Sequence, residues 1–354
     1  MSKTVVTVTG IRPDFIRMSE IFRRLDEDPH FQHILVHTGQ HYDEMLSGVF
    51  FKDLEIREPD FNLSIGGSGK SHYHQQAELS VRIIDLFQQQ DIEPDIVLFL
   101  GDSNSVLASV PLRKEGYKIG HIEAGMRSYD DRMLEEINRK VCDHVSNILF
   151  VYHENYKRKA LREGIGEEKI HVVGNTIMEP LRRNADLAYQ GSNSHILLDI
   201  HRPENFKYPD RMRTIISYAN RYSEYYGLPV KMLSFGRTMA AIEKESLDIG
   251  DIEIVPLMGY KDFVRFQQDS KFIVSDSGTA QEEPALLGIP VLVPREFMER
   301  PESIENGCSF MLELNEETYL SSLVWLDNHP GCPTAWLGGG NTSQRVVDIL
   351  KEVL

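Results

Sequence analysis

Three carboxylates in the first half of the chain have the residue types and positions expected of an acid–base site. Asp102 follows the apolar run "DIVLFL", Glu123 lies in "HIEAGMRS", and Glu135 begins the helical segment "EEINRKVCDHV". Carboxylates gathered at one site repel one another, and this repulsion raises at least one pKa toward neutrality. A carboxyl group with such a pKa can give or take a proton near pH 7. The pattern therefore indicates proton-transfer chemistry.

Two plainer interpretations of these residues remain open. Glu123, Arg127, Glu135 and Arg139 could form a structural ion-pair network, because Arg139 lies one helical turn after Glu135. Asp102 could simply cap the helix that follows it. Spacing alone does not separate these alternatives from catalysis.

A second set of residues has the chemistry needed to bind a diphosphate. Arg12 stands at a helix start after the first strand. Ser277 and Gly278 open a later helix, whose free backbone N–H groups and dipole favour an anion. Glu283, two turns into that helix, could reach ribose hydroxyls. Ordinary capped turns explain the same residues, and the lone His201 in "HRPEN" is equally compatible with a structural role.

The elements that must position these residues are strands alternating with helices. Short β-branched runs occupy residues 4–10, 33–39, 95–102, 118–125, 147–152 and 169–175, and then 195–201, 230–235, 252–257, 271–278 and 290–296. Alternating strand–helix units are typical of parallel sheets, which bind ligands at the carboxyl ends of their strands. Five of the eleven predicted strands end at or beside a candidate residue, namely Arg12, Asp102, Glu123, His201 and Ser277.

A chain of 354 residues exceeds what one hydrophobic core usually organises, so two domains are expected. We predict doubly wound domains at 1–175 and 176–340, with an amphipathic helix at 341–354 that packs back on the first. The cleft between the domains is the expected active site. Neither a membrane-spanning run nor a signal peptide is recognisable, so a cytoplasmic protein is expected.

Several other functions are disfavoured by composition and spacing. A formal net charge of −16 opposes binding of nucleic acid. Three widely spaced cysteines fit neither a disulfide framework nor a zinc site. The pairs His37/His41 and His72/His74 lie in no metal-binding motif, so no metal is predicted. "SIGGSGKSH" has Ser64 where a phosphate loop requires its first glycine, and is expected to be a flexible loop.

Nine motifs, in order and over nearly the whole chain, resemble those of the non-hydrolysing UDP-N-acetylglucosamine 2-epimerase family. They are "GIRPDFIRM", "TGQHYD", "LGDSNS", "HIEAGMRS", "EEINR", "VGNT", "HRPEN", "SDSGTAQEE" and "ERPE". The resemblance implies a GT-B fold of two Rossmann-like domains, interconversion of UDP-GlcNAc and UDP-ManNAc for cell-surface polysaccharides, a homodimer, and no cofactor or metal.

The resemblance also implies a mechanism and a role for each matched residue. A base removes the proton at C2 while UDP leaves C1, giving 2-acetamidoglucal, and UDP adds back after a proton reaches the opposite face. By matching position, Asp102, Glu123 and Glu135 form the acid–base set, and His201 meets the leaving phosphate. The implied substrate-binding residues are Arg12, Arg17, Arg139, Ser277, Gly278, Thr279, Glu283 and Arg300.

The chain departs from the common family motifs at several positions. "TRPEAIKM" is here "IRPDFIRM", with Asp14 for a glutamate and Arg17 for a lysine, whose point charge a planar guanidinium does not reproduce. "DSGG" is here "DSGT", with Thr279, and Phe235 stands where many members have histidine. These features resemble a branch acting on UDP-2,3-diacetamido-glucuronate or UDP-6-deoxy-N-acetylhexosamines. UDP-GlcNAc is the first expectation, with these sugars as alternatives.

Three further activities remain as alternatives. A GT-B glycosyltransferase shares the fold but needs no gathering of three carboxylates. A hydrolysing 2-epimerase would admit water and release free ManNAc. A UDP-sugar-binding regulator is disfavoured, because the set Asp102, Glu123, Glu135 and His201 is complete.

Overall fold

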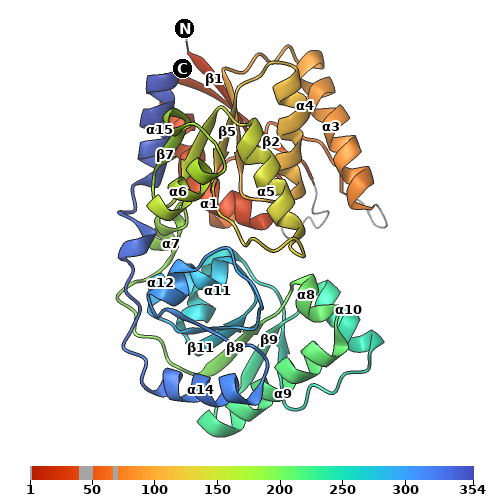
Figure 1. The fold of residues 1–354 in the computed structure, drawn as a ribbon, viewed down its shortest axis with the longest axis vertical. Helices are drawn as coiled ribbons and strands as arrows, with labels where there is room; N and C mark the ends of the chain where they lie inside the picture. The colour runs from red at the N-terminus through yellow and green to blue at the C-terminus, as the bar shows by residue number, and fades with distance from the viewer. Residues whose placement is uncertain (1, 40–50, 67–70) are drawn as a thin grey trace. The chain divides into compact units, whose positions relative to one another are not determined.

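The computed structural model describes residues 2–39, 51–66 and 71–354 (Figure 1). Two motifs noted in the sequence lie partly outside these ranges. "HTGQHYD" is described as far as Gly39, so His41 is not covered, and residues 67–70 of "SIGGSGKSH" are not covered either. The expectations for both segments remain predictions.

The chain divides into two compact units. The first comprises Met1–Pro180 and Leu337–Leu354, and the second comprises Leu181–Trp336. The chain leaves the first unit within α7 (Met178–Asn184) and returns to it at the short 3-10 turn Ala335–Leu337. The last helix therefore belongs to the unit that holds the N-terminus.

The first unit contains a seven-stranded parallel sheet in the order β3-β2-β1-β4-β5-β6-β7. Its strands are β1 (Lys3–Thr9), β2 (Phe31–His37), β3 (Phe61–Asn62), β4 (Ile96–Leu100), β5 (Ile119–Ile122), β6 (Ile148–Val151) and β7 (Ile170–Val172). The order reverses direction between β1 and β4. Such a reversal opens a crevice at the carboxyl ends of the two strands, where ligands bind in doubly wound sheets.

Helices cover the sheet of the first unit on both faces, as the fully buried β4 requires. They are α1 (Arg12–Glu27), α3 (His72–Gln89), α4 (Ser109–Lys114), α5 (Leu134–Val145), α6 (Glu154–Arg162) and α15 (Thr342–Val353). On α3, Leu79, Ile83 and Phe87 recur at intervals of four and share one core cluster with Val97 and Phe99 of β4. This packing fixes the central strands whose ends carry candidate residues.

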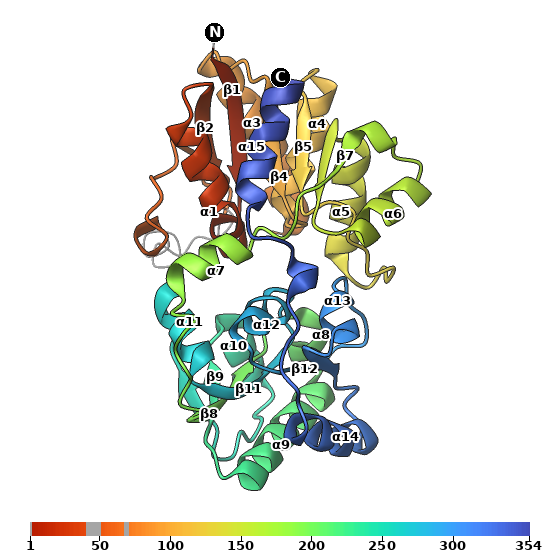
Figure 2. The same cartoon turned by 90° about the vertical axis from the view of Figure 1, so that its left-hand side faces the viewer.

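The C-terminal helix α15 lies beside α1 in the first unit (Figure 2). Arg24 of α1 donates hydrogen bonds of 2.6 Å to the Ser343 hydroxyl and to Gln344 Oε1. Glu179 accepts from the Ser343 backbone N–H at 2.8 Å. These bonds attach α15 to the first unit, although more than 150 residues of the second unit separate the two in sequence.

The second unit contains a six-stranded parallel sheet in the order β10-β9-β8-β11-β12-β13. Its strands are β8 (His195–Asp199), β9 (Val230–Leu233), β10 (Glu253–Val255), β11 (Ser270–Ser275), β12 (Val291–Val293) and β13 (Ser309–Met311). Alternate residues enter separate core clusters, with Ile196 and Leu198 in one and Leu197 in the other, so both faces are covered. The order here reverses between β8 and β11.

The helices of the second unit are shorter on average than those of the first. They are α8 (Pro203–Phe206), α9 (Pro209–Tyr226), α10 (Gly236–Lys244), α11 (Tyr260–Gln268), α12 (Glu283–Leu287), α13 (Glu302–Glu305) and α14 (Glu316–Asp327). The C-cap of α9 is Gly227 with φ 64°, a left-handed conformation that glycine adopts without a Cβ clash.

The predicted α/β class with two parallel sheets is confirmed. Each of the eleven β-branched runs overlaps an observed strand, and only the very short edge strands β3 and β13 were missed. None of the described helices combines the length and hydrophobicity needed to cross a bilayer.

Candidate active site

In the first unit, β5 ends at Ile122, and the next residue, Glu123, has a backbone φ of 66°. A residue with a Cβ rarely adopts this left-handed conformation, which costs about 1 kcal/mol or more and persists only where surrounding contacts enforce it. Gly125, with φ 76°, completes the turn, and a Cβ there would meet the Tyr156 carbonyl oxygen at 2.7 Å. A strained carboxylate at a strand end is an observation that points to function rather than to packing.

Two buried arginines hold the Glu123 carboxylate. Arg17 of α1 places Nη1 3.1 Å from Oε2, and Arg139 of α5 places Nη2 3.1 Å from Oε1. Arg139 also donates at 2.6 Å to the Glu123 carbonyl oxygen. Glu123 and both arginines are at most 3% exposed, so their charges are compensated by one another rather than by water.

Arg139 brings Asp102 and Glu123 together. Its Nη2 atom contacts the carboxylates of both residues. The Asp102 backbone carbonyl accepts from Asn138 Nδ2 at 2.9 Å, which fixes the end of β4 against α5. The cap position of the following 3-10 turn is Ser103, so the interpretation of Asp102 as a helix cap is not supported. The Asp102 side chain remains 19% exposed.

Asp14 joins this cluster, although the sequence analysis did not select it. Its carboxylate accepts hydrogen bonds from the backbone N–H groups of Gly10 at 2.8 Å and Ile11 at 3.1 Å. Burial, with smaller contributions from the charges of Asp102 and Glu123, raises the pKa of Asp14 to about 7. The change of glutamate to aspartate in "IRPDFIRM" was the one sequence signal that could have identified it.

The two neighbouring acidic residues at the start of α5 differ in their surroundings. Glu136 is buried and accepts from the Ser128 backbone N–H at 2.8 Å, which closes the loop between β5 and α5. Glu135, the sequence-predicted member of the acid–base set, is half-buried. The ion-pair network around Glu123 thus contains Arg139, as the structural alternative predicted, but it also contains Arg17 and Asp102.

The buried side chain of His121 is positively charged. His121 of β5 points Nδ1 at Asp143 Oδ1, 2.6 Å away, and Nε2 at the Gly101 carbonyl oxygen, 2.7 Å away. Both partners only accept hydrogen bonds, so both ring nitrogens carry hydrogen. Burial opposes this charge, but Cys142 and Asp143 outweigh burial and raise the pKa of His121 to about 10.

Asp143 links that cation to the strained turn. Its Oδ2 atom accepts from the Gly125 backbone N–H at 3.0 Å and lies 2.7 Å from Arg127 Nη2. Burial raises the pKa of Asp143, but His121 and Arg127 lower it by a larger amount. The pKa of Asp143 therefore lies below its usual range. Arg127 therefore holds the turn after Glu123.

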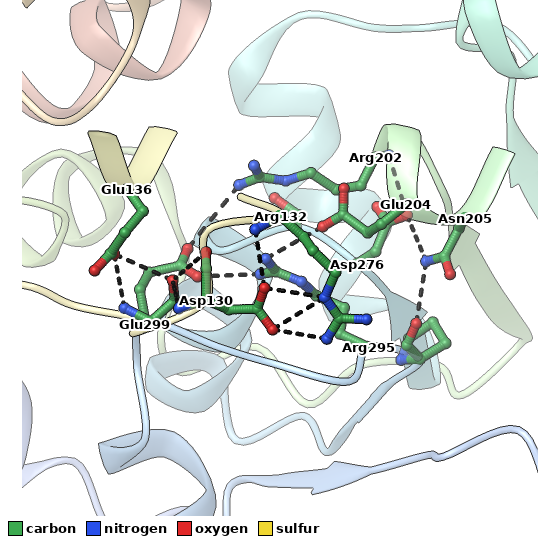
Figure 3. A network of polar contacts seen from close by, with 12 residues as sticks. Asp130, Arg132, Glu136, Arg202, Glu204, Asn205, Asp276, Arg295 and Glu299 are labelled. Carbon is green, nitrogen blue, oxygen red and sulfur yellow. Dashed lines mark hydrogen bonds and ion pairs between the residues drawn. The ribbon is translucent and has the colours of Figure 1, made fainter. Parts of the chain in front are cut away.

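In the second unit, His201 lies two residues after the end of β8. Its side chain is 30% exposed, and Nδ1 lies 3.0 Å from Asp199 Oδ1 and 3.6 Å from Asp276 Oδ1. The ring packs on Phe235, with centroids 4.7 Å apart. Burial opposes protonation, but Asp199 and Asp276 outweigh it and raise the pKa of His201. Asp276 in turn accepts from Asn205 Nδ2 at 3.0 Å (Figure 3).

The segment after β11 differs from its prediction. In place of one regular helix opening at Ser277, the chain forms a 3-10 turn (Thr279–Gln281) and then the five-residue α12. The interruption lies beside Pro284, which has no backbone N–H to donate. Glu283 is consequently the first residue of α12, not a residue two turns into a helix.

The backbone after β11 approaches an arginine–glutamate network closely. A Cβ added at Gly278 would lie 2.4 Å from Arg300 Nη1 and 2.8 Å from Glu299 Oε1, so only glycine fits without displacement. Arg300 is held by Glu282 at 3.0 Å and by Glu299. Glu299 Oε2 also forms an ion pair with Arg295 Nη1 at 3.2 Å (Figure 3).

The remaining predicted binding residues occupy both units. Arg12 is the first residue of α1 and is half-buried. Ser277 and Thr279 flank Gly278 and are half-buried. The Glu283 carboxylate is buried and accepts from the Tyr260 hydroxyl at 2.8 Å. Among the described residues, no cluster of three or more His, Cys, Asp or Glu side chains has a metal-binding arrangement.

Fold and site together define the class of protein. Two doubly wound α/β units, with polar residues at the strand ends where the order reverses, form a GT-B-like fold, as predicted from the motifs. A glycosyltransferase from Rickettsia africae, 15% identical over 99% of this chain with a TM-score of 0.54, shares this fold alone.

The chain belongs to the UDP-N-acetylglucosamine 2-epimerase family, a family of isomerases, because the family model of that description matches residues 23–351. The UDP-N-acetylglucosamine 2-epimerase of Methanocaldococcus jannaschii is 32% identical over 361 residues, covering 97% of each chain. The resemblance inferred from nine motifs is thereby confirmed.

Two further similarities bear on ligands and substrates. A crystal structure of the M. jannaschii enzyme in complex with UDP-GlcNAc and UDP matches with a TM-score of 0.91, at 31% identity and 99% coverage of both chains. A UDP-2,3-diacetamido-2,3-dideoxy-D-glucuronate 2-epimerase from Pseudomonas aeruginosa is 30% identical over 368 residues, covering 99% of each chain. The family thus includes enzymes named for unmodified and for modified UDP-sugars.

Proposed function

We propose that this protein interconverts UDP-GlcNAc and UDP-ManNAc by elimination and re-addition of UDP, without net hydrolysis. The observation that carries the proposal is the buried, strained Glu123, which shares Arg139 with Asp102. An isolated carboxylate in this position would be too costly to keep, whereas one compensated by arginines and held in a fixed direction suits proton transfer.

The proposed reaction begins with proton abstraction at C2 of the sugar by a carboxylate of the first unit. The C2–H electrons form the C1=C2 double bond, and the electrons of the C1–O bond leave with UDP, giving 2-acetamidoglucal. A second acidic group then returns a proton to the opposite face of C2, while a UDP oxygen re-forms the bond to C1. Asp102, Glu123 and Glu135 are the proposed acid–base set, since elimination needs groups on both faces.

The second unit is proposed to bind the nucleotide. His201 meets the departing diphosphate, Gly278 and Thr279 offer backbone N–H groups to its oxygens, and Ser277, whose N–H is bonded to the Ser275 hydroxyl, offers its own hydroxyl. Glu283, oriented by its bond from the Tyr260 hydroxyl, binds the ribose hydroxyls. Arg300 lies directly against Gly278, where Glu282 and Glu299 hold its guanidinium beside this segment.

We propose that three arginines of the first unit contact the substrate: Arg12, Arg17 and Arg139. They differ in the residues that they contact within the protein. Arg17 and Arg139 both contact Glu123, so their positive charges favour the ionised carboxylate before substrate arrives. Arg12, at the half-buried start of α1, is the candidate with the most direct access to an anion.

A modified UDP-N-acetylhexosamine is the second candidate substrate. The 30% identity to the P. aeruginosa diacetamido-glucuronate 2-epimerase favours this alternative, because it nearly equals the 32% identity to the M. jannaschii enzyme. The ring of Phe235, which packs on His201, is one of the departures from the common motif that fit this alternative. We further propose a homodimer that acts in the cytoplasm and supplies a cell-surface polysaccharide precursor.

Proton NMR in heavy water tests the reaction and the substrate together. The protein is incubated separately with UDP-GlcNAc, a UDP-2,3-diacetamido sugar and a UDP-6-deoxy-N-acetylhexosamine. Deuterium at C2 of UDP-GlcNAc, with growth of UDP-ManNAc to equilibrium, is the expected result. Release of free ManNAc would favour a hydrolysing enzyme. Exchange confined to one of the modified sugars would make that sugar the proposed substrate. No exchange with any of the three would overturn the epimerase proposal.

A further inference from the structure

Asp199 and Ser275 connect the ends of the two strands at which the second sheet reverses its order. Asp199 is the last residue of β8 and Ser275 the last residue of β11. The Ser275 hydroxyl donates to Asp199 Oδ2 at 2.7 Å and accepts from the Ser277 backbone N–H at 3.0 Å. The other Asp199 oxygen, Oδ1, faces His201 Nδ1 at 3.0 Å. One carboxylate therefore bridges the proposed diphosphate segment and the proposed diphosphate-binding histidine.

The neighbours of Nδ1 determine the tautomer of His201. Both carboxylates near this nitrogen, Asp199 and Asp276, are acceptors when ionised, so Nδ1 carries hydrogen. Asp276 also accepts from the backbone N–H groups of His201 at 3.0 Å and Arg202 at 3.1 Å. It is thereby committed to fixing the backbone after β8, which leaves Asp199 as the closer partner of the ring.

The charged groups around the ring favour its protonated form. Asp199 from β8 and Asp276 from the end of β11 are opposed by Arg202, and the fourth neighbour, Phe235, is uncharged. Burial also opposes the charge, yet the net pKa of His201 is raised. Because the imidazole is 30% exposed and Nδ1 is occupied, Nε2 is the nitrogen left to meet a ligand.

We propose that Asp199 is a positioning residue that holds the His201 ring through its Nδ1–H and keeps it as an imidazolium, so that Nε2–H donates to an anionic oxygen of a nucleoside diphosphate. The nature of the ligand rests on the proposed function, whereas the Asp199–His201 coupling does not. Without Asp199 the ring would be less readily protonated and would lose the closer of the two carboxylates that fix its orientation.

The experiment compares the full chain with Asp199→Asn, which keeps the shape but removes the charge. The His201 ring signals are assigned with His201→Asn and titrated by NMR, and UDP affinity is measured by calorimetry at pH 5.5 and 7.5. We expect the pKa of His201 to fall in Asp199→Asn. UDP should bind about tenfold more weakly than to the unmodified chain at pH 7.5, and the difference should shrink at pH 5.5, because lower pH favours protonation of the ring in both proteins. Asp210→Asn, at a side chain 98% exposed, is the matched control and should change neither quantity.

The outcomes separate this inference from the proposed function. An unchanged His201 titration in folded Asp199→Asn overturns the inference, whatever the protein binds. Equal weakening of UDP binding at both pH values also overturns the inference, because that result would indicate a structural defect rather than a loss of charge on His201. If the unmodified chain binds no UDP, the proposed function fails, and the titration still decides the coupling. Should Asp199→Asn not fold, Asp199→Ser is measured instead, with the same expected fall in pKa.

Discussion

Arg17 Nη1 lies 3.1 Å from Glu123 Oε2, and both side chains are almost completely buried. The pair joins α1 to the end of β5 across 106 positions of sequence, and it occurs where the common family motif has a lysine. Arg17 also reaches Asn175 Oδ1 at 3.4 Å. Both contacts are made by the same atom, Nη1, whose two N–H groups lie in the fixed plane of the guanidinium, a geometry that a lysine ammonium does not reproduce.

Removing Arg17 should destabilise the first unit. In Arg17→Met the buried Glu123 loses one of its two arginines, and breaking a buried pair typically costs about 3 kcal/mol or more. Arg17→Lys should lose less, because the charge remains. Urea denaturation at pH 7.5 measures the difference, with the exposed Arg113→Met as control. A loss below about 0.5 kcal/mol in Arg17→Met would show that Arg139 alone compensates Glu123.

Glu123→Gln should abolish exchange of the C2 proton with solvent deuterium. The amide cannot accept the proton, so we expect turnover to fall by about a thousandfold or more, while UDP affinity stays within about tenfold. Deuterium incorporation followed by NMR and UDP calorimetry measure the two effects. Glu168→Gln, at an exposed position of the same unit, should leave both unchanged. Unimpaired turnover of Glu123→Gln would sink its assignment as an acid–base residue.

Much of the fold could be predicted because its signal is local. Runs such as "TVVTVT" and "IVLFL" are long enough to show β-branched and apolar enrichment, and β1 and β4 occur there. β3 and β13 have two and three residues, too few for any periodicity to appear. The interruption at Pro284 was visible in the sequence, but the strength of the preceding glycine and serine signals favoured one helix.

Candidate site residues could be chosen from the sequence, but the contacts among them could not. Asp102, Glu123 and Arg139 were identified from strand ends and motifs, but the φ of 66° at Glu123 is imposed by tertiary contacts and leaves no local signature. The bond from His121 to Asp143 spans 22 positions, and nothing in their spacing indicates it. Partners of this kind depend on the register of neighbouring strands and helices, which a single sequence does not specify.

The buried His121 should make stability depend on alkaline pH. Its folded pKa of about 10 lies above the unfolded value of 6.5, so its contribution is complete below pH 6.5 and is lost as pH rises through 10. The stability difference between the unmodified chain and His121→Asn should therefore be large at pH 6 and much smaller at pH 10. Urea denaturation at both values measures it, with the half-exposed His144→Asn as control. A difference independent of pH would mean that the ring is neutral.

Asp14 should likewise make stability fall as pH rises, because it is an acid whose folded pKa is raised. Its protonated form is favoured on folding, so the stability it contributes is complete below about pH 3.8 and is lost as pH rises through 7. Asp14→Asn stays neutral at every pH. Its free energy of unfolding, relative to that of the unmodified chain, should therefore increase between pH 5 and pH 8, by on the order of 3 kcal/mol at most. The exposed Asp85→Asn should show no such gain. If Asp14→Asn is no more favourable at pH 8 than at pH 5, the carboxyl group titrates normally.

Gly278→Ala tests whether close backbone approach at the end of β11 matters for binding. The added Cβ would lie 2.4 Å from Arg300 Nη1, so the arginine or the backbone must move, and the proposed diphosphate segment moves with them. We expect UDP to bind at least about tenfold more weakly, with a smaller change in unfolding free energy, because the far end of a side chain can shift more cheaply than a core can repack. Gly236→Ala is the matched control, since a Cβ there meets no atom within 4 Å. Equal UDP affinity in the two variants would place the diphosphate elsewhere than on this segment.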